Sequence, residues 1–331
     1  MSDRPEEAKI ILVTGGAGYI GSHMVLKLLE NGYRPVVIDN LSTGHRRFIP
    51  SIVPFIEADL KDIEAAQRVF EEFDFEAVVH FAASALVPES MADPIKYYQN
   101  NLISTINLAK IMMEYGVKKL VFSSSCSVYG EVQVFPIIEE TPMAPTNPYG
   151  HSKLMAERIL MDVASRQNLF FIFLRYFNVA GAHKSGKIGE WHNPETHLIP
   201  NILLFALGNK DTFEIYGDTY PTPDGTCIRD YIHVDDICDA HIMALEAFDK
   251  NIKNENINLG TGTGFSVKEI IQRVEEITGR KIEHKISGPR LGDPARLVAS
   301  NEKAKRILGW EPQKSLSEII SSAWNYMKSR K

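Results

Sequence analysis

The chain has 331 residues and a net charge of −6, with 44% hydrophobic and 24% charged residues. This composition is typical of a globular protein with one large or two smaller domains, and its acidic balance argues against broad nucleic-acid binding, which needs a basic surface. The sequence contains no run of 18 apolar residues, so no membrane span is predicted. Residues 1–8 are polar and are not a secretory signal. The three cysteines (Cys126, Cys227 and Cys238) are scattered, which predicts a cytoplasmic protein.

The first half of the chain alternates short apolar runs with amphipathic segments. Buried strands are predicted at residues 9–14, 35–39, 53–57, 77–81, 119–123 and 170–174. Helices are predicted between them at residues 20–31, 62–73, 94–115 and 148–167. Strands that are apolar throughout and alternate with helices indicate an α/β fold with a doubly wound parallel sheet, Rossmann-like, covered by helices on both faces.

The pattern changes after about residue 178. Polar loops are expected at 182–194 and 219–226, helices at 197–207 and 235–248, a strand at 256–259, and two or three helices in 266–331. No low-complexity linker separates the two parts. We therefore expect a first domain of residues 1–178, to which 232–258 return, and a smaller C-terminal α/β lobe of residues 179–231 and 259–331 over the sheet.

A glycine-rich turn follows the first predicted strand. Gly15, Gly18 and Gly21 form a G-x-x-G-x-x-G motif before the next helix. Glycines let the backbone approach a pyrophosphate closely, and the helix N-terminus offers free N–H groups. Asp39 ends the next strand. A carboxylate at this position binds an adenosine ribose and repels a 2′-phosphate, so NAD is favoured over NADP. Two arginines at 46–47 weaken that preference slightly. The alternative is a glycine-rich turn without a ligand.

A proton-transfer motif starts the helix predicted at 148–167. Tyr149 and Lys153 are four residues apart and share one helix face. Asn147, just before this helix, is expected to be its N-cap. A nearby ammonium and the helix N-terminus favour the phenolate, which would let Tyr149 act as a base. The serine run 123–125 ends a predicted strand, so that a serine hydroxyl can bridge Tyr149 and a substrate oxygen. The alternative is a packed tyrosine and a solvated lysine.

Both motifs occur within longer strings that extend over nearly the whole chain. The strings are VTGGAGYIGSH, VVIDNLSTG, HFAA, YYQNN, VFSSSCSVYG, NPYGHSK, LRYFNVAGA, HLIP, GTCIRDYIHVDD, NLGTGTGFSV and RLGDPARL. This combination resembles the extended short-chain dehydrogenase/reductase family, and within it the members that invert C4 of UDP-hexoses. The resemblance implies an NAD-dependent epimerase that acts on UDP-glucose and UDP-galactose through a transient 4-keto sugar. It also implies a homodimer through the helices at 94–115 and 148–167, although helices that only cover the sheet would carry the same apolar stripes.

The resemblance also implies the residues of the site. Tyr149 would be the base, Lys153 its partner and Ser125 the catalytic serine. The cofactor-binding residues would be Gly15, Gly18, Tyr19, Ile20, Gly21, Asp39, Asn40, Asp59, Leu60, Phe81, Ala82, Ala83, Asn100, Ser123, Tyr149, Lys153 and Tyr176. The substrate-binding residues would be Ser125, Tyr149, Asn178, His197, Leu198, Tyr216, Arg229, Arg290, Asp293 and Leu297.

Two positions bear on the choice of reaction. Relatives that dehydrate nucleotide sugars have Asp-Glu where this chain has Cys126-Ser127, and a dehydratase is not expected because elimination of water needs that acid and base. The resemblance also implies that Leu297 lies near the sugar's C2 substituent, where a tyrosine would exclude N-acetyl sugars. Leucine is smaller and would admit them, unless Leu297 is only a core residue. The alternatives are therefore an epimerase of UDP-N-acetylglucosamine and UDP-N-acetylgalactosamine, a net dehydrogenase and, more remotely, a non-catalytic nucleotide-binding sensor.

The ten histidines show no clustered ligand spacing such as H-E-x-x-H. His192 and His197 flank a loop and a helix start, and polar loop roles are expected for them rather than metal binding. Cys126 is expected to be a packing residue rather than a nucleophile.

Overall fold

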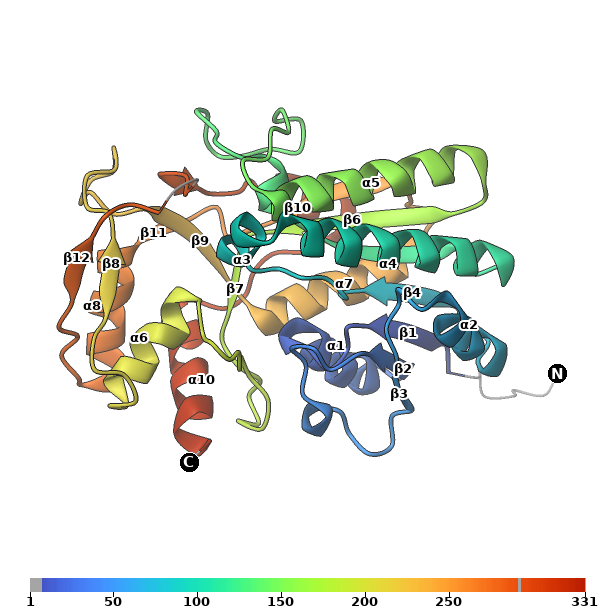
Figure 1. The fold of residues 1–331 in the computed structure, drawn as a ribbon, viewed down its shortest axis with the longest axis horizontal. Helices are drawn as coiled ribbons and strands as arrows, with labels where there is room; N and C mark the ends of the chain where they lie inside the picture. Colours follow the sequence, from blue (N-terminus) through green and yellow to red (C-terminus); the bar gives the residue numbers. More distant parts are fainter. Residues whose placement is uncertain (1–7, 291–292, 331) are drawn as a thin grey trace.

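The computed structural model describes residues 8–290 and 293–330. Most of the polar N-terminal segment, and Leu291 and Gly292 of the RLGDPARL string, lie outside the described residues. The main sheet consists of β1 (Ile10–Thr14), β2 (Arg34–Asp39), β3 (Phe55–Glu57), β4 (Ala77–His80), β5 (Lys119–Ser125), β6 (Phe170–Tyr176) and β10 (Glu255–Leu259). Its order is β10-β6-β5-β4-β1-β2-β3, and every pairing is parallel (Figure 1). The predicted fold class is thereby confirmed.

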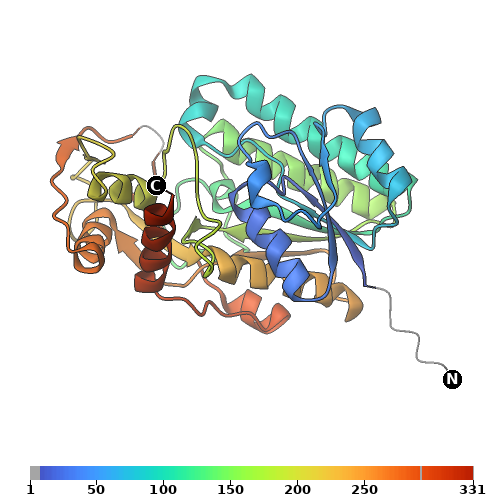
Figure 2. The same cartoon turned by 90° about the horizontal axis from the view of Figure 1, so that it is seen from below.

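Helices cover both faces of this sheet, as Figures 1 and 2 show. One face carries α1 (Tyr19–Glu30) and α7 (Val234–Asp249), and the other carries α2 (Ile63–Glu72), α4 (Pro94–Glu114) and α5 (Pro148–Arg166). The two apolar cores take alternate residues of each strand, so that Leu12 packs in one core and Val13 in the other. This alternation follows from the pleat of a strand that is buried on both sides.

Two features of the first part differ from prediction. Strands β5 and β6 each continue two residues further, because Ser124 pairs with Arg175 and Ser125 with Tyr176 in the parallel ladder. A short helix, α3 (Val87–Ala92), was not predicted, since six residues are too few to show helical periodicity.

The C-terminal lobe contains two small sheets. The larger is built on β9 (Ile228–His233), which pairs with β7 (Asn178–Ala180), β11 (Gly264–Ser266) and β13 (Arg296–Leu297), and the smaller joins β8 (Glu214–Tyr216) to β12 (Lys285–Ser287). None of these strands was predicted. Most are two or three residues long, and β9 contains the buried charged residues Arg229 and Asp230, which hide its apolar pattern.

The lobe's own core lies among α6 (Leu198–Ala206), α8 (Val267–Thr278) and α10 (Leu316–Ser329). With α9 (Glu302–Leu308), the described residues after 266 form three helices, where two or three were predicted. Although α7 and β10 follow β7 and β9 in sequence, α7 packs on the main sheet and β10 is its edge strand. The domain limits given above stay a prediction. Across the described ranges, every helix is too short or too polar to cross a bilayer.

Candidate functional site

Many of the predicted site residues lie at the carboxyl ends of the parallel strands. The glycine turn follows β1, Asp39 ends β2, Phe81 follows β4, and Ser125 ends β5. Tyr176 ends β6 and pairs with Ser125 in register. This is the edge at which open α/β sheets bind ligands.

The glycine turn is packed too closely for side chains. Gly15 has a φ of +68°, and a Cβ there would lie 2.6 Å from the main-chain nitrogen of Ala82. A Cβ on Gly21 would lie 2.2 Å from the carbonyl oxygen of Gly15. Helix α1 begins after Gly18, which provides no side-chain cap for the N–H groups of the first turn. The close backbone and the uncapped N–H groups fit a bound pyrophosphate.

Asp39 is fixed at the end of β2 by main-chain donors. Its carboxylate accepts hydrogen bonds from the N–H of Ala17 at 2.9 Å and of Leu41 at 2.8 Å. Burial raises the pKa of Asp39, and these hydrogen bonds partly offset the rise. The carboxylate is therefore held in place beside the glycine turn.

The two arginines that follow Asp39 are engaged elsewhere. Arg46 stacks on Phe55, with its guanidinium carbon 4.6 Å from the ring centre, and Arg47 stacks on Trp191 at 3.5 Å. Neither arginine pairs with Asp39 in the described part of the chain. The arrangement fits an adenosine ribose without a 2′-phosphate, and hence NAD.

Helix α5 brings Tyr149 and Lys153 to the end of β5. Asn147 caps this helix, since its Oδ1 accepts a first-turn N–H at 2.9 Å. Lys153 is only 3% exposed, and its Nζ donates a hydrogen bond to the carbonyl oxygen of Ser123 at 2.7 Å. The hydroxyl of Ser125 is close enough to Tyr149 to influence its pKa through a hydrogen bond. The three predicted catalytic residues therefore meet at one strand end.

Burial dominates the protonation of these groups. It raises the pKa of Tyr149 to about 12, against the hydrogen bond from Ser125. It lowers the pKa of Lys153 to about 7, against the charge of Glu157. The expectation that the ammonium favours the phenolate is therefore not met by the protein alone, because desolvation is the larger effect. A further positive charge, such as that of an oxidised nicotinamide, favours the phenolate and opposes this effect of burial on the pKa of Tyr149.

A buried ionic network that was not predicted holds α5 against β5 and β6. Arg175 donates two hydrogen bonds to Glu157, at 2.8 and 2.6 Å, and both side chains are almost fully buried. Ser124 donates to the same carboxylate at 2.5 Å, and Arg175 donates to the hydroxyl of Tyr129 at 3.0 Å. The only signal in the sequence was a charged residue directly after an apolar run. The network fixes the strand end next to Ser125.

Two arginines of the lobe occupy different settings. Arg229 on β9 is buried, forms an ion pair with Asp293, and is not paired with its neighbour Asp230, whose carboxylate accepts main-chain N–H groups instead. The ion pair of Arg229 is therefore buried and does not involve its neighbour in sequence. Arg290 stacks on Tyr216, with its guanidinium carbon 4.1 Å from the ring centre.

Leu297 lies on β13, directly opposite Arg229 in the parallel register. It is buried and belongs to the main apolar core. Leu297 therefore has a packing role, and its role as a gate for the sugar stays a prediction.

The remaining predicted residues lie around the same edge or at the start of the lobe. Asn178 begins β7, His197 is the N-cap residue of α6, and Leu198 begins that helix. The hydroxyl of Tyr19 donates to the carbonyl oxygen of Gly181 at 2.7 Å, which ties α1 to the lobe.

The outer cofactor residues make polar contacts with one another. Asn40 donates to the carboxylate of Asp59 at 3.1 Å, while Asn100 donates to the hydroxyl of Ser84 at 3.1 Å. Its neighbour Asn101, which was not predicted, is buried and donates to the hydroxyl of Ser152 on α5 at 2.8 Å. The adjacent asparagines in the YYQNN string are the sequence feature that could have indicated this contact.

Comparisons with known proteins agree with this geometry. Residues 11–260 match the NAD dependent epimerase/dehydratase family. A UDP-glucose 4-epimerase of Halalkalibacterium halodurans is 50% identical over 319 residues, which cover 96% of this chain and 95% of the relative. A solved UDP-glucose 4-epimerase of Bifidobacterium longum, in complex with NAD+ and UDP, superimposes with a TM-score of 0.92 at 40% identity and covers 97% of this chain and 98% of its own. The UDP-Glc/GlcNAc 4-epimerase of Campylobacter jejuni gives a TM-score of 0.84 at 41% identity, covering 97% of this chain and 100% of its own.

Proposed function

This chain belongs to the NAD dependent epimerase/dehydratase family, and we infer that it interconverts UDP-glucose and UDP-galactose by inverting C4 of the hexose, with NAD as cofactor. The observation that carries the inference is the meeting of Tyr149, Ser125 and Lys153 at the end of β5, beside the glycine turn. A nucleotide-binding sensor has no need of this group, whereas proton transfer at a hydroxyl requires it.

NAD fits the residues at the strand ends. Gly15, Gly18 and Gly21 would hold the pyrophosphate, and Asp39 would hold the adenosine ribose. Lys153, beside Tyr149 at the end of β5, would bind the nicotinamide ribose. When bound, NAD supplies the reversible hydride acceptor for C4 and a positive ring near Tyr149.

The chain's own residues move the proton. Tyr149 takes the proton of the C4 hydroxyl, and Ser125 positions that hydroxyl by a hydrogen bond. Tyr149 is partly buried at the end of β5, so its hydroxyl stays accessible to a bound sugar. After the sugar has turned, Tyr149 returns the proton to the same oxygen, now on the opposite face of the ring.

Rotation of the 4-keto sugar within the site requires tight binding of the nucleotide and weak binding of the hexose. Arg229 and Arg290 are placed on the lobe to bind the diphosphate, since guanidinium groups pair bidentately with phosphate. Tyr216, stacked under Arg290, restricts that side chain. The alternative substrates, UDP-N-acetylglucosamine and UDP-N-acetylgalactosamine, are favoured by the small side chain of Leu297 and by the likeness to the Campylobacter jejuni enzyme.

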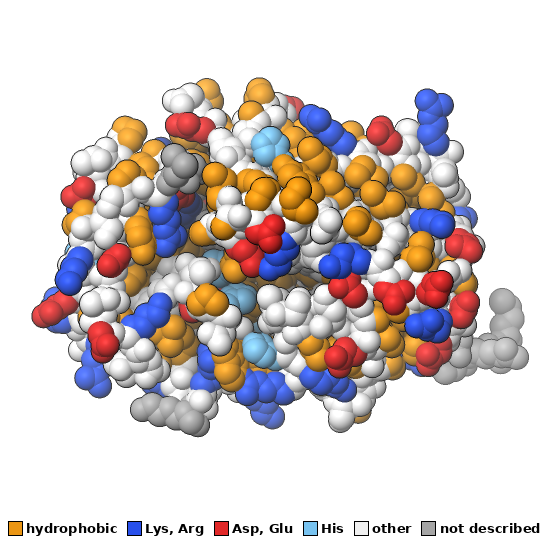
Figure 3. Space-filling view, in the orientation of Figure 1, with side chains coloured by type: hydrophobic (Ala, Val, Ile, Leu, Met, Phe, Trp, Pro, Cys, Tyr) orange, Lys and Arg blue, Asp and Glu red, His pale blue; other side chains and the backbone are white. Residues whose placement is uncertain are grey.

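A cytoplasmic homodimer is also proposed. All three cysteines are free, which suits a reducing compartment. Helices α4 and α5 expose large apolar side chains, which gather on the face drawn in Figure 3. These are Ile95, Ile103, Ile106, Met155 and Met161. Apolar groups exposed together favour burial against a second copy, and sedimentation equilibrium tests this.

The activity is tested by incubating the purified protein, without added NAD, with UDP-galactose or UDP-N-acetylgalactosamine and following the anomeric protons by NMR. Conversion to the gluco epimer establishes the epimerase and a retained cofactor, and the ratio of the two rates gives the preferred sugar. Turnover that consumes added NAD and releases its reduced form identifies a dehydrogenase instead. Binding of UDP without turnover, with NAD supplied, identifies a sensor.

A further inference from the structure

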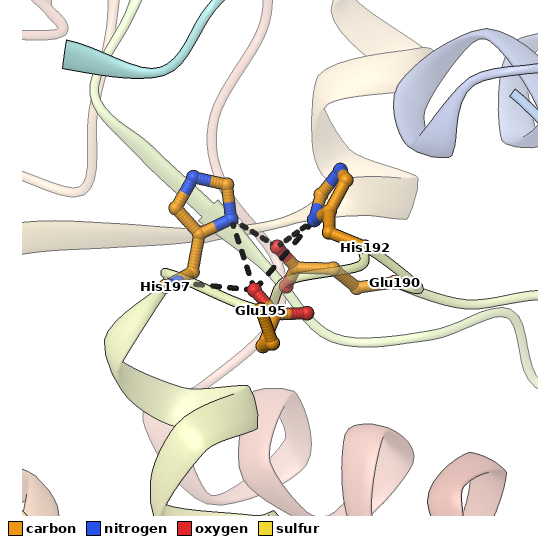
Figure 4. Close-up of side chains that lie close together, drawn as sticks. All are labelled: Glu190, His192, Glu195 and His197. Atoms are coloured by element: carbon orange, nitrogen blue, oxygen red, sulfur yellow. Dashed lines mark hydrogen bonds and ion pairs between the residues drawn. The ribbon is translucent and has the colours of Figure 1, made fainter. Parts of the chain in front are cut away.

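A cluster of two histidines and two glutamates lies in the segment between β7 and α6 (Figure 4). Glu190, His192, Glu195 and His197 each present one donor atom within 4.8 Å of the others. Nδ1 of His192 lies 3.4 Å from Oε1 of Glu190 and 3.6 Å from Oε1 of Glu195. Nδ1 of His197 lies 3.8 Å from Oε1 of Glu195 and is hydrogen-bonded to Glu190. Both imidazoles therefore turn the same nitrogen toward the two carboxylates.

The two carboxylates of this cluster need positive charge nearby. The side chains of Glu190 and Glu195 are only 5% and 6% exposed. In the described part of the chain their ion-pair partners are His192 and His197, and no lysine or arginine lies within ion-pair distance. Two buried carboxylates side by side repel each other unless cations compensate them.

The cluster also contains a buried nitrogen without a hydrogen-bond partner. Nδ1 of His192 is buried and has no such partner among the described residues, although it faces both carboxylates in Figure 4. An unpaired buried polar atom is costly and needs an explanation. Oε1 of Glu195 is already oriented by the main-chain N–H groups of Thr196 and His197, at 2.9 and 3.0 Å. Such outer hydrogen bonds are typical of carboxylates that bind metals.

We propose that Glu190, His192, Glu195 and His197 bind a divalent transition-metal ion, with Zn²⁺ as the best match. Imidazole nitrogens and carboxylate oxygens bind Zn²⁺ at about 2.0–2.2 Å in tetrahedral sites, which places neighbouring donors about 3.3–3.6 Å apart. Three of the donor separations, 3.4, 3.6 and 3.8 Å, are close to this value, while Glu190 and His197 lie closer together. Four protein donors leave no open position, so the ion is structural rather than catalytic.

The segment that carries the donors is anchored on both sides. The ring of Trp191, between two of the donors in sequence, lies between Arg47 and Arg330, at 3.5 and 3.6 Å from their guanidinium carbons. A Cβ on Gly189 would lie 2.4 Å from the ring of Tyr326 on α10. Donors on an anchored backbone lose less entropy when they bind an ion.

The position of the cluster indicates what the ion does. His197 is the N-cap residue of α6, and Leu198, in the predicted nucleotide-sugar site, follows it. A metal on Nδ1 of His197 fixes the start of α6 and leaves Nε2 uncoordinated. The ion therefore joins the segment after β7 to the substrate-binding edge of the lobe.

Polar loop roles were predicted for His192 and His197 from the sequence. The spacing Glu190-x-His192-x-x-Glu195-x-His197 matches no common ligand motif, because such motifs place donors on a helix or a tight turn. Here an irregular loop brings the four donors together.

The proposal is tested on the purified protein with its cofactor, stripped of metal by a chelator and then supplied with Zn²⁺ alone. Bound zinc is measured by mass spectrometry after gel filtration, and affinity by competition with a chromogenic chelator. Co²⁺ replaces Zn²⁺ in a second experiment, in which visible absorption reports tetrahedral coordination. His192→Gln and Glu195→Gln each remove one donor, and His284→Gln removes an exposed histidine outside the cluster as the control.

The expected result is about one Zn²⁺ per chain in the wild type and in His284→Gln, with at least about tenfold weaker binding in the two donor variants. The intense absorption of Co²⁺ is expected to weaken in those variants as well. If the wild type retains far less than one ion per chain, the proposal is wrong. Equal binding by wild type and a folded donor variant, checked by thermal melting, also overturns it.

Discussion

Lys153 donates a hydrogen bond from Nζ to the main-chain carbonyl oxygen of Ser123, over 2.7 Å. This contact links the first turns of α5 to the end of β5 from inside the site. The ammonium is buried, and burial lowers the pKa of Lys153 to about 7 against the charge of Glu157. The site therefore holds a lysine that changes charge near neutral pH.

The buried lysine predicts a rise in stability with pH for the cofactor-free protein. Lys153 has a pKa of 10.5 when unfolded and about 7 when folded, so the unfolded chain holds more protons between these values. Its contribution to the free energy of unfolding should increase by about 2 kcal/mol from pH 7 to pH 9. Urea unfolding at both pH values should show a smaller increase in Lys153→Met than in the wild type. An equal increase in both proteins contradicts the burial argument.

Removal of the proton acceptor should abolish most of the turnover. Tyr149→Phe is expected to lower kcat about 10²- to 10⁴-fold, because no other group takes the C4 proton. UDP affinity and NAD retention should be unchanged, since the ring remains. Tyr33→Phe, which lies before β2 at the opposite end of the sheet, is the control. A decrease below tenfold by the NMR assay would show that another group is the base.

Replacement of the buried arginine on β9 should weaken substrate binding more than chemistry. Arg229 already binds Asp293 and the carbonyl oxygen of Ile228, and a lysine cannot keep both contacts and also bind a diphosphate. Arg229→Lys is expected to raise KM for UDP-galactose at least about tenfold, with a smaller change in kcat. Arg296→Lys changes an exposed arginine on the neighbouring strand β13 and should leave KM unaltered. A loss confined to kcat would place Arg229 elsewhere in the reaction.

The side chain opposite Arg229 should set the preference for the sugar. Leu297→Tyr is expected to reduce turnover of UDP-N-acetylgalactosamine more than that of UDP-galactose, because the larger ring occupies the space of the N-acetyl group. Overpacking of the core should cost about 1–3 kcal/mol, so stability is measured in parallel. Leu297→Met keeps the volume and should retain the wild-type ratio of rates. An unchanged ratio in Leu297→Tyr rejects the gate.

The buried ion pair between Glu157 and Arg175 should contribute strongly to stability. Glu157→Gln leaves the Arg175 guanidinium buried without its charge partner and should destabilise the protein by about 3–5 kcal/mol. Glu275→Gln removes the partner of the highly exposed Lys281 and should cost less than about 1 kcal/mol. Urea unfolding compares the two variants. Similar losses would mean that burial does not decide the strength of these pairs.

The sequence by itself determined the main sheet, its covering helices, the glycine turn and the Tyr149–Lys153 motif. These features depend on short-range physics: apolar runs bury, helical spacing places residues four apart on one face, and glycines permit a close turn. The meeting of Tyr149 with Ser125 follows from the parallel α/β pattern, in which the strand ends share one edge of the sheet.

Only the tertiary structure decided which distant charges meet. Arg229 pairs with Asp293 rather than with the adjacent Asp230, and Glu157 pairs with Arg175 across α5 and β6. The short strands of the lobe and the cluster of Glu190 with His197 likewise appear only after folding. Their positions depend on how loops without periodicity place charged side chains in space, and a buried charge binds whichever partner the fold brings within reach.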